Sequence, residues 1–126
     1  MKRLAIALAA TAAALAPVAP ALAHHSAAIF NFRTPKTATG TVKEIRVINP
    51  HSHMILTITD ARGMRDWDFE GHSASNFYRA GYNRDAVKPG DVISITYAPL
   101  RDGRDGGYIV AFTTADGTHV GFDPPG

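Results

Sequence analysis

Two apolar patterns that meet at a polar corner, in residues 40–60, constrain the fold of this chain more than any other feature. Residues 53–59 alternate between apolar and other side chains, which is typical of a half-buried strand. In residues 41–48 the apolar phase shifts once, and such a shift predicts a β-bulge that bends the strand. Residues 49–53, Asn-Pro-His-Ser-His, have the composition of a turn. The segment therefore predicts a bent first strand followed by a regular second strand.

The rest of the chain continues the β pattern and interrupts it once. Residues 74–80 predict a short helix, with Ser73 as its N-cap and Gly81 as the residue that ends it. Residues 100–107, rich in Gly and Asp, predict a flexible loop. The further predicted strands are residues 64–70, 92–97, 108–113 and 119–122.

This order of elements favours an all-β fold with one short helix. The architecture that we expect is a small OB-like β-barrel of five to six strands, with the helix between strands 3 and 4. An open β-sandwich of similar strand count is the alternative, although sandwiches more often lack such a helix. The predicted core consists of Val42, Met54, Leu56, Ile58, Trp67, Phe69, Phe77, Ile93, Ile95, Val110 and Phe112.

The first 23 residues have the pattern of a secretory signal peptide. A positive start, Lys2-Arg3, precedes an apolar run and an Ala-x-Ala site, which predicts cleavage after Ala23 and a periplasmic or secreted protein. A membrane anchor is the weaker alternative, because a span needs about 20 apolar residues. We therefore expect no membrane span after processing. The expected divisions are a signal peptide (1–23), an N-terminal arm (24–38), the barrel domain (39–122) and a C-terminal tail (123–126).

Charge and cysteine content argue against a nucleic-acid-binding protein and exclude a disulfide-stabilised one. Removing 23 of the 126 residues leaves 103, which is the size of one domain. Of the 13 Lys and Arg residues, two lie in the leader, so 11 remain against 11 Asp and Glu. A balanced mature chain offers no electrostatic reason to bind nucleic acid. Because the chain has no Cys, its core must be stable without disulfides.

Short motifs along the mature chain resemble those of a known family. The motifs are His24-His25-Ser26, Gly40-Thr41-Val42, Asn49-Pro50-His51, Trp67-Asp68-Phe69-Glu70, Gly81-Tyr82, Gly90-Asp91, Pro99-Leu100-Arg101-Asp102-Gly103 and Asp116-Gly117. In this order they resemble a family of small exported bacterial proteins that carry a domain of unknown function. The chain departs from that family by Tyr82, where Trp is common, and by a second corner histidine, His53. The resemblance implies export and a shared fold, and it brings no activity with it.

The histidines are the residues with the most specific chemistry. All six lie in the mature chain, and processing after Ala23 would give His24 both a free amine and a ring nitrogen. That pair can chelate a metal ion, and His51 or His53 could supply a further nitrogen, a set suited to copper and, less strongly, zinc. The alternative is structural, because Asn49 and Ser52 are typical turn residues and a corner imidazole can cap buried carbonyls.

No catalytic motif is present, so we do not expect an enzyme. The acidic residues of the third strand, Asp66, Asp68 and Glu70, are interpreted as a solvated outer face. Two functions remain open. The first is an exported binding module for a small ligand, a metal ion or an envelope protein. The second is a structural or accessory envelope protein that uses the barrel as an interaction surface.

Overall fold

The computed structural model describes residues 27–122, and these form a mostly β fold with one short helix after the third strand. The strands and the helix are β1 (Lys36–Arg46), β2 (His53–Asp60), β3 (Gly63–Glu70), α2 (Ala74–Arg79), β4 (Val92–Pro99), β5 (Gly107–Thr113) and β6 (His119–Gly121). His24 and the tail 123–126 lie outside the described residues.

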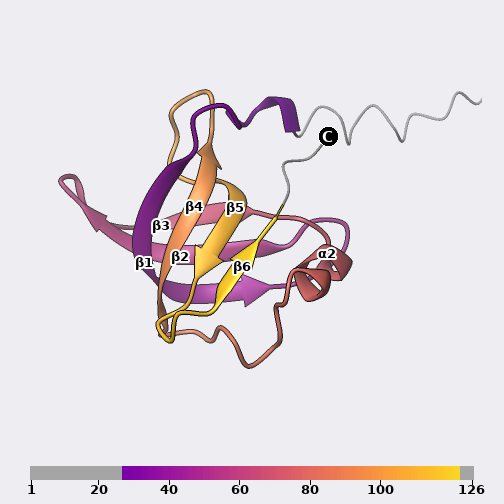
Figure 1. Ribbon diagram of the computed structural model, residues 1–126. Coiled ribbons are helices and arrows are strands. Elements are labelled where there is room, and N and C mark those ends of the chain that lie inside the picture. Colours follow the sequence, from indigo (N-terminus) through magenta and orange to yellow (C-terminus); the bar gives the residue numbers. More distant parts are fainter. Residues whose placement is uncertain (1–26, 123–126) are drawn as a thin grey trace, which may run out of the picture.

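The six strands form one sheet in the order β3-β2-β1-β4-β5-β6, with antiparallel neighbours. An additional parallel pairing joins β3 to β5, through Phe69 opposite Gly107 and Glu70 opposite Tyr108. The pairings therefore link five strands in a closed ring, β1-β2-β3-β5-β4, with β6 outside it. In Figure 1 the strands β4 and β5 cross β2 and β3 steeply, and α2 lies beside one end of the sheet.

A bend in β1 lets one strand pair on both sides of this ring. Its first half pairs with β4 and its second half pairs with β2. Between Val42 and Glu44 the register shifts, so Lys43 is the extra residue of a bulge, and Figure 1 shows the strand turning. This confirms the bulge predicted from the apolar phase. The strand begins at Lys36, within the range expected for the arm.

A second bulge changes the face predicted for β5. Thr96 pairs with Ala111 and Tyr97 pairs with Ile109, which leaves Val110 without an opposite residue. The extra residue reverses the alternation, so Ile109 is fully buried in the main core and Val110 is half-buried elsewhere. The prediction that Val110 belongs to the main core is therefore wrong.

The main core otherwise contains the residues that the strand patterns predicted. Val42, Met54, Leu56, Ile58, Phe69, Phe77, Ile93, Ile95 and Phe112 are all buried in it. Trp67 is only half-buried and packs against this cluster from one side. The core also includes Tyr82, Val87, Tyr97, Ile109 and Val120, which the prediction had left out.

The helix α2 begins at Ala74 and ends before Gly81, as predicted, but the predicted N-cap residue does not supply the capping hydrogen bond. Gly81 has φ +97°, its N–H donates to Tyr78 O, and Tyr82 N–H donates to Phe77 O, which together make a Schellman motif. Ser73 occupies the N-cap position without a capping hydrogen bond from its side chain. Instead, Ala74 N–H donates to Asn49 Oδ1 and to Ile48 O, so the polar corner before β2 caps the helix.

The described part of the arm packs against the sheet, as expected from its aromatic residues. Phe30 is 3% exposed and forms an isolated bridge with Leu100. Phe30 and Phe32 each meet the Tyr108 ring edge-on, at centroid distances of 5.3 and 5.4 Å. These contacts form a second apolar cluster and fix where the chain enters the domain. Within residues 27–122, no helix has the length and apolarity needed to cross a bilayer.

Candidate functional site

The corner before β2 is held by its serine and by backbone contacts. Ser52 is fully buried, and its Oγ lies within hydrogen-bond distance of Ile48 N and Ile48 O, at 3.2 and 3.3 Å. Ser52 N–H donates to His72 O at 3.0 Å, and Gly71 N–H donates to Ser52 O at 2.7 Å. Asn49 and Ser52 therefore have the turn roles predicted for them, and the corner has a defined position next to the end of β3.

The two corner histidines each face a carboxylate of β3. His51 Nδ1 lies 3.3 Å from Glu70 Oε1, and His53 Nδ1 lies 3.1 Å from Asp68 Oδ1. His51 Nδ1 is buried, yet no described residue makes a hydrogen bond with it. Asp68 is 61% exposed, in agreement with the solvated face expected from the sequence, whereas Glu70 departs from it, with a side chain only 20% exposed.

A hollow of about 210 Å³ lies beside these residues. Ile29 and Phe30 of the arm, His53 of β2, and Asp68 and Glu70 of β3 are among its lining residues. Burial raises the pKa of neighbouring Tyr108 to about 12, with a smaller contribution from the Glu70 charge, so its phenol stays neutral. The hollow thus contains one imidazole, three carboxylates (Asp68, Glu70 and Asp105) and the guanidinium of Arg104, beside the start of the described chain.

Backbone contacts hold the arm against this hollow. Arg101 N–H donates to Ile29 O at 2.9 Å, and Asn31 N–H donates to Pro99 O at 2.8 Å. The Arg101 guanidinium adds a hydrogen bond from Nε to Ala28 O, also at 2.9 Å. Residue 29 is therefore tied to the loop between β4 and β5, five residues after His24.

The described histidines do not form a metal centre by themselves. Residues 27–122 contain no group of three or more His, Cys, Asp or Glu side chains arranged to hold a metal ion. His72 stacks on Phe122 at 5.2 Å and meets Tyr108 edge-on, and His119 contacts Thr113 Oγ1 at 3.1 Å. His53 is thus the predicted ligand that lines the hollow, and His51 lies one contact away through Glu70.

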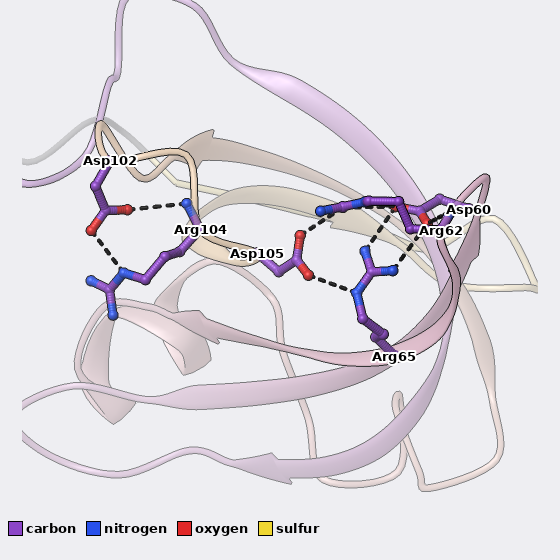
Figure 2. Close-up of polar contacts among 6 residues, drawn as sticks. All are labelled: Asp60, Arg62, Arg65, Asp102, Arg104 and Asp105. Atoms are coloured by element: carbon purple, nitrogen blue, oxygen red, sulfur yellow. Dashed lines mark hydrogen bonds and ion pairs between the residues drawn. The ribbon is translucent and has the colours of Figure 1, made fainter.

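An ion-pair network that no sequence pattern indicated is shown in Figure 2. Arg62 Nη2 lies 2.8 Å from both Asp60 Oδ2 and Asp105 Oδ1. Arg65 also reaches both carboxylates, with Nη2 3.0 Å from Asp60 Oδ2 and Nε 2.9 Å from Asp105 Oδ2. The network joins the β2–β3 turn to the β4–β5 loop. Because Asp105 is 45 residues from Asp60 in the chain, no local pattern could have indicated this contact.

Comparison with known proteins places the chain in one family. A model described as "Family of unknown function (DUF6152)" matches residues 11–109, which is most of the chain. The chain belongs to the DUF6152 family. No curated protein and no solved structure matches it. Membership in the DUF6152 family assigns no activity to the site.

In this DUF6152 protein, the ion-pair network predicts loss of stability in acid. Hydrogen bonds from both arginines lower the pKa values of the two carboxyl groups. The larger contribution comes from Arg62 for Asp60 and from Arg65 for Asp105. Their stabilisation is complete above the unfolded pKa near 3.8 and is lost as the pH falls through the lower folded values. We expect the urea midpoint of unfolding to decrease between about pH 5 and about pH 2.

A pair of matched variants tests the source of this acid sensitivity. Asp105→Asn should weaken the pH dependence of stability, because the asparagine amide is neutral and has no charge to lose on acidification. Asp85→Asn is the control, since the Asp85 side chain is 92% exposed and lies 3.8 Å from Lys88. If the two variants retain the same pH dependence as the unaltered protein, the network does not cause it.

Proposed function

We propose that this chain is an exported metal-binding module, periplasmic or secreted, that takes up a copper-type ion at the hollow beside His53. It has no catalytic role in this proposal. The observation that carries it is that Ile29 and His53 line the same hollow. If the leader is removed after Ala23, His24 lies three positions before Ala27, the first described residue, where a hydrogen bond from Phe30 N–H to Ala27 O closes a turn. An extended chain of three residues spans up to about 10 Å. The proposal requires that this short segment fold toward His53.

The donor atoms suit copper. The amine and ring of His24 would form a chelate, and His53 would add a third nitrogen, with His51 as the nearest alternative. Metal-binding histidines commonly present one ring nitrogen to a carboxylate and the other to the ion. His53 has this pairing with Asp68 through Nδ1, at 3.1 Å. His51 Nδ1 lies 3.3 Å from Glu70 Oε1 without a hydrogen bond, which makes His51 the weaker candidate. A nitrogen-only set favours Cu(II), with Zn(II) the weaker candidate.

The same proposal takes the fold to be an OB-like barrel. The ring of five paired strands and the helix between β3 and β4 support it. Oligonucleotide binding, a frequent use of such barrels, is not part of the proposal, because the mature chain has balanced charge. Export rests on the leader pattern of residues 1–23.

The extra-residue test decides whether the N-terminal amine binds the metal. Adding one Gly before His24 should weaken Cu(II) binding by at least about 100-fold, because the tethered chelate is lost while every side chain remains. Equilibrium dialysis of the two mature proteins, each with its N-terminus confirmed by intact mass, measures the difference. Affinity should also fall as the solution is acidified, because ligation needs unprotonated nitrogen and protons compete with the metal ion.

Alanine variants test the histidines of the corner. His53→Ala, or His51→Ala if that residue is the ligand, should reduce the affinity for Cu(II). His119→Ala is the matched control, since His119 lies on β6 and contacts Thr113. Equal affinity with and without the added Gly, together with no effect of either corner variant, would favour the second function. The chain would then be an accessory envelope protein that uses the barrel as an interaction surface.

A further inference from the structure

A second hollow, of about 320 Å³, lies on the other side of the β4–β5 loop. Arg104 and Asp105 of that loop line both hollows, but the composition of the second is different. Its charged residues are Lys36, Arg62, Arg101, Arg104 and Asp105, so four cations face one carboxylate. The first hollow instead contains Asp68 and Glu70.

Pairing with nearby carboxylates leaves part of this positive charge uncompensated. Arg62 and Arg65 are balanced by Asp60 and Asp105, and Arg104 lies 2.7 Å from Asp102. In the described part of the chain, neither Lys36 nor Arg101 forms an ion pair with a carboxylate. The cluster therefore carries an excess of two positive charges in a mature chain that is balanced overall.

The arginines keep donors available for a ligand. Arg101 uses Nε for Ala28 O, and Arg104 uses Nε for Asp102. Each guanidinium has five N–H donors, so the terminal nitrogens remain for a further acceptor. The same Nε contacts restrain the two side chains, which lowers the entropy lost when they bind a ligand.

An aromatic wall completes the hollow. Trp67 and Tyr97 both line it, with ring centroids 6.2 Å apart and an edge-on geometry. The indole Nε1 of Trp67 is buried and has no hydrogen-bond partner among the described residues. A concave site with an apolar wall and a few convergent donors is typical of small-molecule pockets, which are about 300–1,000 Å³.

We propose that this second hollow binds a small organic anion with two acidic groups, either carboxylates or phosphates. Arginine matches both groups through paired N–H donors, and Lys36, at the start of β1, adds a point charge. The hollow is the right size for a molecule of this kind and too small for a macromolecular surface. This proposal does not rest on metal binding at the first hollow, with which the second shares Arg104 and Asp105.

Calorimetric titration of the metal-free mature protein with succinate and with inorganic pyrophosphate tests the proposal. At low salt at least one of the two should bind with a stoichiometry of one, and the stronger binder identifies carboxylate or phosphate as the recognised group. Lys36→Gln should weaken that binding about fivefold, the usual upper contribution of an exposed charge pair. Added salt should weaken it further.

Lys88→Gln provides a control with the same change in net charge. Lys88 is 62% exposed and does not line this hollow, so binding should stay as in the unaltered protein. The proposal is overturned if neither anion binds at millimolar concentration, or if the two Lys→Gln variants weaken binding equally. Lys36 does not line the first hollow, so Lys36→Gln should leave the Cu(II) titration unchanged.

Discussion

Replacing Leu56 by alanine is expected to lower the free energy of unfolding by about 2–5 kcal/mol. Leu56 lies in the middle of β2, is 0% exposed, and sits opposite Val42 on one side and Trp67 on the other. Truncation removes buried methyl groups and leaves a cavity that neighbouring strands in a closed ring cannot collapse to fill. Urea unfolding at neutral pH, followed by Trp67 fluorescence, measures the change.

Val92→Ala is the matched control for this measurement. Val92 is also a β-strand residue, but it lies on β4 with 52% exposure, so its truncation should cost less than about 1 kcal/mol. A loss for Leu56→Ala no larger than that for Val92→Ala would contradict the inward register of β2.

Replacing Gly106 by alanine is expected to cost a similar amount, about 2–5 kcal/mol, for a different reason. Gly106 has φ +104°, and a Cβ built there would lie 2.2 Å from Asp68 O. The residue directly precedes Gly107, which pairs with Phe69 to join β5 to β3. A side chain at this position would push the two strands apart, so the pairing that closes the ring would weaken. Urea unfolding gives the size of the effect.

Gly103→Ala is the control that separates the two causes of the expected stability loss at position 106, the steric clash and the unfavourable backbone conformation. Gly103 lies in the same loop and also has a positive φ, +79°, but a Cβ there meets no atom within 4 Å. It should therefore show only the left-handed backbone cost of about 1–2 kcal/mol. If the two variants lose equal stability, close approach at the β3–β5 junction is not the reason that position 106 needs glycine.

The β4–β5 loop has a larger part in this protein than its composition suggests. It bonds to the arm through Arg101, to the β2–β3 turn through Asp105, and it separates the two hollows. Gly106→Ala should therefore also affect both proposed sites, whereas Leu56→Ala should act mainly on stability. Ligand titrations of the two folded variants would distinguish these effects.

The candidate sites were only partly predictable. The sequence singled out His51 and His53, because two histidines flank a turn at positions that a strand register brings to one end of β2. It did not indicate Glu70 and Asp68 as their partners, since those contacts depend on the pairing of β2 with β3. The basic hollow could not be predicted for a similar reason. Its cations, Lys36, Arg62, Arg101 and Arg104, come from three separate segments of the chain, and the overall charge is balanced.

Local pattern determined most of the fold by itself. Alternation identified the strand faces, an interrupted phase identified the β1 bulge, and Gly81 identified the end of α2. These features depend on residues that are neighbours in the chain, so their physical causes are visible in the sequence.

Only the tertiary structure decided the features that need distant residues to meet. The bulge at Val110 follows from how β5 must pair with β4, and it exchanges Val110 for Ile109 in the core. The helix is capped by Asn49 rather than by Ser73 because the corner packs against its first turn. The β3–β5 pairing that closes the ring, and the ion pairs of Asp105, likewise join segments far apart in sequence. Such contacts are selected by the packing of the whole chain, where the burial of many side chains at once outweighs the preference of any one segment.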